Sequence, residues 1–212
     1  MKTARTERVT ATRELILTTA ERLFAEHGVF AVSNRQISEA AGQGNNTAVG
    51  YHFGTKTDLI RAILQKHAAP VEEIRRRMLA ELGDEPTVRD WVSCLVRPQT
   101  EYLAGLGNPT WFARFGAQVM TDPELRAIMG AESLSSPALR QIVDGLLGSL
   151  PELPIEVRQE RSQMMRLLMV HLLAEQERGL ADGTPVPRAT WQDVATGLID
   201  AIAGLYLAPY ST

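Results

Sequence analysis

Apolar residues recur at helical spacing along most of the chain, and the first clear set lies in residues 10–27. Ile16, Ala20 and Phe24 follow one another at intervals of four, which places them on one face of a helix. Gly28 comes soon afterwards, and glycine commonly ends a helix. The pattern therefore predicts an amphipathic helix that turns an apolar stripe towards a core.

Two shorter helical patterns follow, over residues 34–41 and about 47–53. Their apolar stripes include Ile37 in the first segment and Val49 in the second. Two glycines lie between them, and glycine interrupts helices while it tolerates left-handed backbone. Two short helices joined by such a turn are typical of a helix-turn-helix, which we expect over residues 33–58.

The rest of the chain also favours helices, because no stretch alternates with the period of two that is typical of strands. Breaks that contain Gly, Pro or Asp separate the helices predicted at residues 56–82, 87–104, 109–120, 123–130, 137–150, 155–178 and 190–208. Pro70 and Pro98 fall inside two of them, where proline bends a helix. We expect an all-α fold: residues 1–56 form a helix-turn-helix domain with a flexible N-terminal arm at residues 1–9, and residues 57–212 form a helical ligand-binding and dimerisation domain.

The distribution of charge distinguishes the two expected domains. The net charge of the chain is −3, yet residues 1–66 contain nine Lys or Arg and six Asp or Glu and so carry +3. The remaining residues contain thirteen Lys or Arg and nineteen Asp or Glu, which gives −6. A basic end on an acidic body is typical of a small DNA-binding domain attached to a second domain.

The polar face of the second short helix carries groups that suit contacts with nucleic acid. Thr47, Tyr51 and His52 offer hydrogen-bonding or stacking side chains, and Asn45 and Asn46 come just before them. A helix that lies in the major groove of DNA presents such groups to base edges and phosphates. We therefore expect these five residues to contact DNA.

Two residues at the start of the first short helix add to this surface. Ser33 is a good N-cap, and its hydroxyl is also placed where a helix N-terminus meets a phosphate. The two roles can coexist. Arg35 lies in the first turn, and its fork of donors suits phosphate oxygens.

A longer series of apolar, glycine and aromatic positions extends this pattern across residues 10–58. It consists of Ile16, Ala20, Leu23, Phe24, Gly28, Ile37, Ala40, Ala41, Gly42, Tyr51, His52, Phe53, Gly54, Thr55 and Lys56. Taken together, these positions resemble the DNA-binding domain of the TetR family of transcriptional regulators. The resemblance implies a three-helix DNA-binding domain followed by a helical domain that binds an effector.

The resemblance also assigns a role to Lys56, which matches a family lysine that contacts the DNA backbone. A point charge there would contribute affinity and salt dependence, not sequence choice. The chain departs from the family in two places. It has one residue more than usual between Gly42 and Phe53, and it carries Gly50 where many members have an aromatic residue. Which residues of the second short helix read bases is therefore left open.

The last two predicted helices favour a homodimer. Residues 164–174 are apolar on nearly every side, which is more than one core face requires. Gly197, Ala201 and Gly204 would let another helix approach closely, so we expect an isologous four-helix interface. The expected contact residues are Leu168, Leu172, Leu198, Ile202 and Leu205. Plain burial within one subunit is the alternative interpretation.

Aromatic and methionine residues gather in the central helices, near the bend predicted at Pro98. In the TetR family this region holds a small-molecule effector. The candidate residues are Trp91, Tyr102, Trp111, Phe112, Phe115 and Met165. As a group they favour a mostly apolar ligand, whereas each one alone is more typical of a core residue.

No set of residues indicates an enzyme or a metalloprotein. The four histidines lack a carboxylate or cysteine at metal-ligand spacing, so we expect neither a metal nor another cofactor. Cys94 is the single cysteine; it has no activating partner and fits a core position in a reducing cytoplasm. The chain has neither the apolar run of roughly 18 residues that suggests a membrane span nor the pattern of a secretion signal.

The sequence therefore predicts a cytoplasmic, homodimeric and ligand-responsive transcriptional regulator. We expect a repressor that a small, mostly apolar effector releases from a double-stranded DNA operator. The alternative is a helical small-molecule-binding module, or an all-α enzyme, whose N-terminal domain no longer reads DNA. An activator would use the same surfaces, and the sequence does not distinguish it from a repressor.

Overall fold

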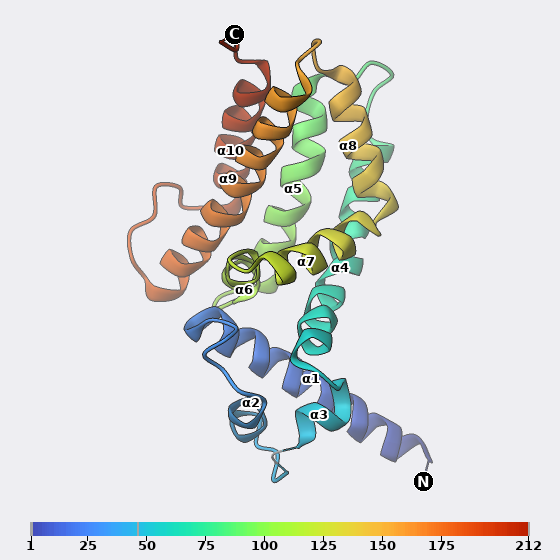
Figure 1. The fold of residues 1–212 in the computed structure, drawn as a ribbon, viewed down its shortest axis with the longest axis vertical. Helices are drawn as coiled ribbons and strands as arrows, with labels where there is room; N and C mark the ends of the chain where they lie inside the picture. The colour runs from blue at the N-terminus through green and yellow to red at the C-terminus, as the bar shows by residue number, and fades with distance from the viewer. Residues whose placement is uncertain (1, 46, 212) are drawn as a thin grey trace.

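The computed structural model describes residues 2–45 and 47–211, and within them every regular element is a helix, which confirms the predicted all-α fold. In chain order the helices are α1 (Lys2–His27), α2 (Asn34–Ala40), α3 (Ala48–Phe53), α4 (Lys56–Ala80), α5 (Val88–Leu106), α6 (Phe112–Met120), α7 (Pro123–Leu134), α8 (Pro137–Ser149), α9 (Ile155–Asp182) and α10 (Trp191–Leu207). Figure 1 shows α1, α2 and α3 together at one end, which we call the head, and α5, α8, α9 and α10 at the other, which we call the body. The long helix α4 runs from the head into the body, and α6 and α7 lie between the two parts.

The first helix is longer than its apolar pattern predicted. α1 begins at Lys2, so the flexible arm expected at residues 1–9 is wrong for residues 2–9, which are helical. No Gly or Pro interrupts this segment. Thr10 lies inside the helix, where its hydroxyl donates to the carbonyl of Thr6 at 3.1 Å, a bond that Thr often makes within helices.

The head is held together by the apolar stripes that the sequence predicted. Ile16, Ala20 and Phe24 of α1 are buried, and so are Ile37 of α2 and Val49 of α3. Full burial of a side chain as large as isoleucine or phenylalanine contributes about 1.5–3 kcal/mol. The long helix α1 and the two short helices α2 and α3 therefore stabilise one another through a shared core.

The core of the head continues into α4, α6 and α7. Leu59 and Ile63, from the first half of α4, are buried in the same cluster as Phe115 and Val119 of α6. The Phe115 ring stacks on Phe24 of α1 with 6.2 Å between ring centroids. The apolar packing therefore crosses the domain boundary that was predicted after residue 56. The head packs against α6 as well as against α4.

Two further apolar clusters form the core of the body. One joins α5 to α10 and contains Ile202, and the other joins α5 to α8 and contains Cys94 and Ile142. Met165 and Met169 of α9 pack against both clusters. Burial raises the pKa of the Cys94 thiol to about 11, which fits an unreactive core residue. None of the helices in the described part of the chain is long and apolar enough to cross a membrane.

Candidate functional site

Ser33 and Arg35, both predicted to contact DNA, are exposed at the start of α2. Ser33 is the N-cap: its hydroxyl oxygen accepts from the N–H of Gln36 at 3.2 Å, and the Gln36 side-chain oxygen accepts from the N–H of Ser33 at 2.8 Å. Arg35 Nε lies 2.8 Å from a carboxylate oxygen of Glu39, which raises the pKa of Arg35. An exposed ion pair of this kind contributes little, so Arg35 is able to exchange it for a DNA phosphate.

The turn between α2 and α3 is built by local hydrogen bonds. Gly42 has a φ of +64°, and the N–H of Gln43 donates back to a carbonyl in the last turn of α2 at 3.0 Å, which ends that helix in a left-handed turn. The side-chain oxygen of Asn45 then accepts from the N–H and the hydroxyl of Thr47 at 2.9 and 2.6 Å. Both residues are exposed, and their mutual bonds fix the start of α3. Asn46, the next candidate, lies outside the described residues.

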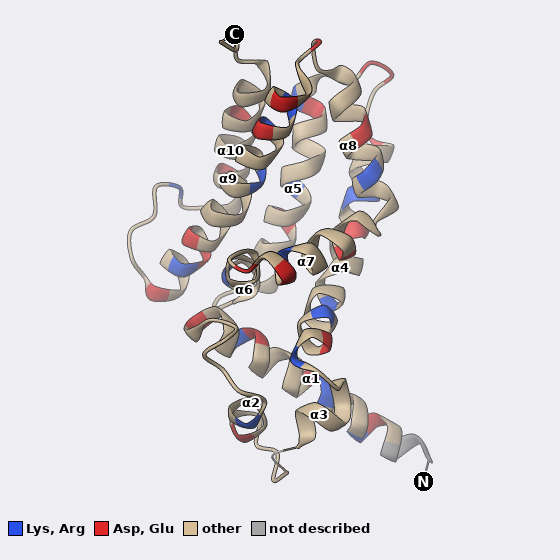
Figure 2. Cartoon of the chain, viewed as in Figure 1, with Lys and Arg blue, Asp and Glu red and all other residues tan. Residues whose placement is uncertain are grey.

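The outer face of α3 is exposed and carries no charge. Tyr51 is 80% exposed, and its ring stands edge-on to that of His52 with 5.0 Å between centroids. A Cβ added at Gly50 would meet no atom within 4 Å, so the backbone is bare there. In Figure 2 α3 is uncharged along its length, whereas Lys and Arg lie on the neighbouring helices. This is a surface that can enter a groove while basic side chains on either side reach phosphates.

Arg13 of α1 holds the far side of α3. Its Nη1 donates to the carbonyl of His52, and its guanidinium carbon lies 4.2 Å from the centre of the Phe53 ring. Both contacts fix the end of α3 against α1, with the cation over the face of an aromatic ring. No motif marks Arg13, and its one signal in the sequence is its place one turn before Ile16 on the packed face of α1.

Lys56 has an internal role in this structure. Its ammonium donates to the carbonyls of Val29 and Val32 at 3.1 and 2.6 Å, which ties the α1–α2 loop to the start of α4. Burial lowers the pKa of Lys56. At least two of its three N–H donors are engaged in these bonds, and the contact of Lys56 with the DNA backbone stays a prediction.

Four of the six residues predicted to bind an effector lie in the head core or at the junction of α4, α5 and α6. Phe115 is buried in the head core, and Trp111 packs against the same cluster. Phe112 stacks on the ring of His67 with 3.9 Å between ring centroids. The hydroxyl of Tyr102 lies 2.7 Å from Nδ1 of the same histidine. These four aromatic residues therefore belong to packed or hydrogen-bonded structure.

The other two effector candidates lie in the body. Trp91 packs so closely on Gly145 that a Cβ there would come within 2.4 Å of the indole ring. Met165 lies between the two body clusters. None of the six candidates lines either of the two hollows described below, and their assignment to an effector site stays a prediction.

The residues predicted at a dimer interface fall into two groups. Leu168, Leu172 and Leu205 line an open hollow of about 500 Å³ on the outer surface of α9 and α10. Leu198 and Ile202 of α10 are wrong as contact residues, because they are 2% and 0% exposed and face the core of their own subunit. The period of the helix turns these two positions inwards, towards α5.

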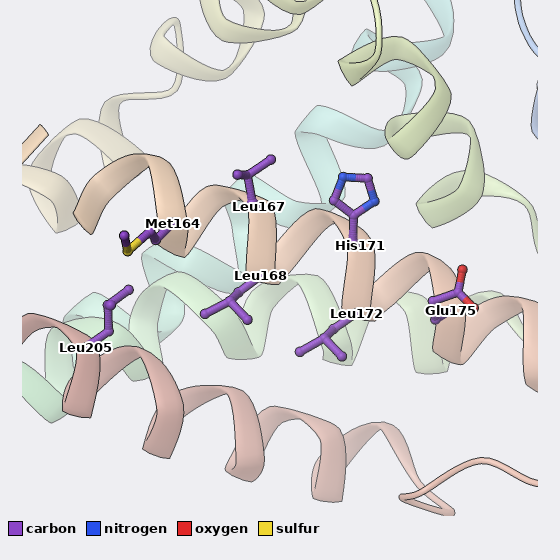
Figure 3. Close-up of a pocket in the computed structure, with 7 residues that line it drawn as sticks. All are labelled: Met164, Leu167, Leu168, His171, Leu172, Glu175 and Leu205. Atoms are coloured by element: carbon purple, nitrogen blue, oxygen red, sulfur yellow. The ribbon is translucent and has the colours of Figure 1, made fainter. Parts of the chain in front are cut away.

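The hollow on α9 and α10 is apolar, with one charged residue at its end. Figure 3 shows Met164, Leu167, His171 and Glu175 projecting from the same stretch of α9 as Leu168 and Leu172, with Leu205 of α10 beside them. A second hollow, of about 480 Å³, is lined by the end of α9, the loop after it and the start of α10. Within the part of the chain that the structure describes, no cluster of three or more His, Cys, Asp or Glu is arranged to hold a metal ion.

Comparison with known proteins matches both parts of the chain to one family. A family model described as "Bacterial regulatory proteins, tetR family" matches residues 16–63, and one described as "Tetracyclin repressor-like, C-terminal domain" matches residues 93–204. A repressor from Corynebacterium glutamicum, "HTH-type transcriptional repressor AcnR", is 32% identical over 98 residues, which are 44% of this chain and 52% of the relative. Its counterpart from Corynebacterium efficiens is 30% identical over 132 residues, 60% of this chain and 61% of the relative. The match spans about half the length of the first of these curated relatives.

Solved structures show the same arrangement of helices. NalD, the secondary repressor of the MexAB-OprM multidrug efflux pump in Pseudomonas aeruginosa, superposes with a TM-score of 0.59 at 24% identity, over 96% of this chain and all of that one. AmtR of Mycobacterium smegmatis gives a TM-score of 0.58 at 21% identity, over 90% of this chain and 86% of that one. At such identities the likeness extends to the fold alone. The two family models, the second of which covers more than half of the chain, decide the matter: this chain belongs to the TetR family of bacterial regulatory proteins.

Proposed function

We propose that this protein is a homodimeric transcriptional repressor that binds a DNA operator and leaves it when a small, mostly apolar effector binds. The observation that carries the DNA part is the outer face of α3, where the exposed Tyr51 and the bare backbone at Gly50 are free of charge, while the neighbouring helices carry Lys and Arg among their charged residues. Membership of the TetR family and the likeness to two repressors of Corynebacterium support the same conclusion. The function places the protein in the cytoplasm, where bacterial DNA lies.

The proposed dimer forms through the outer face of α9 and α10. Met164, Leu167 and Leu172 are large apolar side chains that one subunit leaves exposed along α9. The neighbouring face of α10 has Ala201 and Gly204 exposed, so a second helix is able to approach its backbone closely. Contiguous exposed apolar surface of this kind marks an interaction site. In such a dimer we expect the two copies of α3 to reach half-sites about one DNA turn or slightly more apart, on the order of 34 Å or above.

The proposed effector site lies in the body, among the helices that the family uses for ligands. Met165 and Met169 support an apolar ligand, because they sit between two separate clusters and methionine adapts its shape to a bound molecule. An effector shifts the protein from the DNA-binding form only by its difference in affinity between the two forms. Effector binding would rotate the two heads, so that their separation no longer matches the spacing of the half-sites.

Selection of duplexes from a random-sequence library, followed by gel shifts over a salt series, tests the DNA part. We expect one sequence to be enriched and bound more tightly than random duplex, with an affinity that falls steeply as salt rises. Equal binding of selected and random duplexes would instead favour a small-molecule-binding module whose head no longer reads DNA.

The effector part is tested by reciprocity between ligand and DNA. Compounds that raise the melting temperature are titrated against the protein with and without the selected duplex. An effector lowers the DNA affinity by the same factor by which DNA lowers the effector affinity. A compound that binds in the body and leaves the DNA affinity unchanged contradicts its role as an inducer.

A further inference from the structure

A carboxylate from α9 caps the start of α6. The residue at the N-cap position of α6, Trp111, makes no side-chain capping bond. Glu177 of α9 takes that role: it accepts from the N–H groups of Ala113 and Arg114 at 3.2 and 2.8 Å and from the Thr110 hydroxyl. A negative charge at a helix N-terminus is also favoured by the helix dipole.

The contact is buried and closed. The Glu177 side chain is 1% exposed, and its second oxygen also accepts from Arg114 Nε at 3.3 Å. The same guanidinium donates from Nη2 to the carbonyl of Thr110 at 2.7 Å. A buried carboxylate is stable only when its oxygens are bonded, so the four donors fix both the position and the direction of α6 relative to α9.

Further along, α6 packs into the head core. Phe115 and Val119 are fully buried in the head core, where Phe115 stacks on Phe24 of α1. Figure 1 shows α6 between α1 and the lower part of α9. One short helix is therefore bonded to the body at its start and packed into the head along its length.

The outer face of α9 carries the proposed dimer contact, and Glu177 follows it closely in the same helix. Glu175 lies at the end of that hollow, two residues before Glu177. A continuous series of contacts thus runs from the proposed dimer face through α9 and Glu177 to α6, and from α6 through Phe115 to α1, which Arg13 joins to α3.

We propose that Glu177 is a positioning residue that sets the separation and orientation of the two DNA-reading heads, and so the spacing of the half-sites that the dimer accepts. The inference rests on the proposed function as a DNA-binding dimer. With the cap intact, the dimer is rigid and rejects a wrongly spaced operator. With the cap weakened, each head still reads its half-site but the fixed spacing is lost.

The test compares Glu177→Gln with the wild-type full chain on duplexes selected by the wild type. The selected spacer is compared with spacers one base pair longer and shorter, since one base pair moves a half-site by about 3.4 Å and rotates it by about 36°. The amide that replaces the carboxylate would place N–H donors against donors of α6. For each protein, the dissociation constant for an altered spacer is divided by the dissociation constant for the selected spacer. We expect this spacer ratio to be lower by about threefold or more for Glu177→Gln than for the wild type. Binding to an isolated half-site and the dimeric state should stay as in the wild type.

Two further variants complete the experiment. Glu101→Gln makes the same chemical change at an exposed carboxylate that pairs with Arg77 of α4, and should leave the spacer ratio unchanged. Thr110→Val removes one donor to Glu177 and keeps the shape of the side chain; it should lower the ratio in the same direction, and it decides the test if Glu177→Gln does not fold. If Glu177 merely stabilised the fold, Glu177→Gln would lower the affinity for all duplexes by the same factor, whatever their spacer. That result, which leaves the spacer ratio unchanged, overturns the inference. Failure of the wild type to select any duplex overturns the proposed function instead.

Discussion

Arg13 shows how a residue outside the reading surface can govern it. Its guanidinium reaches the carbonyl of His52 and covers the Phe53 ring, so the last turn of α3 is attached to α1. Tyr51 and His52 belong to this turn, and their direction depends on where the turn lies. The Arg13 contact therefore bears on the stability of the head and on the orientation of the groups that face DNA.

Arg13→Ala should lower the free energy of unfolding by about 1–2 kcal/mol, because it removes a cation–π contact and a hydrogen bond from a charged donor. Denaturant unfolding followed by helix signal measures the change. Arg8→Ala, at an exposed position on the same helix, serves as the control and should have little effect. Equal stability of the two variants would show that the Arg13 contacts do not hold α3.

We expect Lys56 to act mainly in the stability of the head and Arg35 to make the phosphate contact that the resemblance assigned to Lys56. Lys56→Ala should destabilise the head by about 1–3 kcal/mol, since it leaves the carbonyls of Val29 and Val32 without their donor. Arg35→Ala should leave stability unchanged and reduce the slope of log affinity against log salt by about 0.9, the value for one lost phosphate contact. Melting curves measure the stability of both variants, and salt titrations of DNA binding measure their slopes. A smaller salt slope for Lys56→Ala with unchanged stability would make Lys56 the main phosphate contact.

At the scale of single elements, α3 depends on its turn and on its bare outer face. The left-handed Gly42 and the bonds from Thr47 to Asn45 define where the helix begins. Gly50 and Tyr51, which we expect to lie nearest to DNA, are both exposed on the side away from the core.

Gly50→Ala tests whether DNA comes close to the backbone of α3. The added Cβ meets no protein atom within 4 Å, and alanine favours a helix over glycine by about 0.5–1 kcal/mol, so thermal stability should rise. Affinity for the selected duplex should fall, because the methyl group occupies the space that the groove needs. A rise in stability with unchanged affinity would mean that DNA does not approach this position.

The capping box of α5 predicts a dependence of stability on pH. The hydroxyl and N–H of Thr87 donate to Asp90 at 2.6 and 2.9 Å, which holds the pKa of Asp90 below its ordinary value. Since the folded pKa is the lower one, the carboxylate stabilises the fold above the unfolded pKa of about 3.9, and that contribution is lost as the pH falls through the folded pKa.

Asp90→Asn should therefore lower the free energy of unfolding by about 0.3–1 kcal/mol at pH 7. It should also make that free energy less dependent on pH below about pH 4. Asp144→Asn, at an exposed position on α8, is the control. Unfolding curves at a series of pH values measure both effects, and equal acid profiles for Asp90→Asn and the wild type would contradict the assignment.

Local periodicity predicted the elements well and the contacts between distant elements poorly. The spacing of Ile16, Ile37 and Val49 sufficed to predict buried faces, because such faces repeat every three or four residues. The Glu177 cap joins residues more than sixty positions apart, and nothing in the pattern around α6 indicates it. The inward turn of Ile202 was missed for the same reason: an apolar run on a helix does not say which side meets which neighbour.

At the scale of the whole molecule, head and body share one continuous framework. The head core includes residues from the first half of α4 and Phe115 and Val119 of α6, so the apolar packing continues across the boundary predicted after residue 56. His67 of α4 adds a polar joint, with Glu21 of α1 at 2.9 Å on one side and Tyr102 of α5 at 2.7 Å on the other. His67 thus links α1 to α5 through two hydrogen-bonding contacts.

The dimer face provides a test at this scale. Leu172→Glu places a charge on the outer face of α9 at a position that is 46% exposed in one subunit, so the subunit should still fold. Sedimentation should show a monomer at concentrations where the wild type is dimeric, and operator affinity should fall because the two half-sites are no longer bound together. Leu134→Glu, at an exposed position on α7, is the matched control. If Leu172→Glu were still dimeric, the interface would lie on another face.

The central claim is that α3 reads DNA, and the most direct measurement of it is a specificity ratio. Dissociation constants of the wild type and Tyr51→Ala are measured for the selected duplex and for random duplex at one salt concentration near 0.15 M. We expect the wild type to favour the selected duplex by a factor on the order of 1,000 or more, and Tyr51→Ala to lose much of that factor while its binding to random duplex changes little. A wild-type ratio near one, or a ratio that Tyr51→Ala leaves intact, would contradict the account.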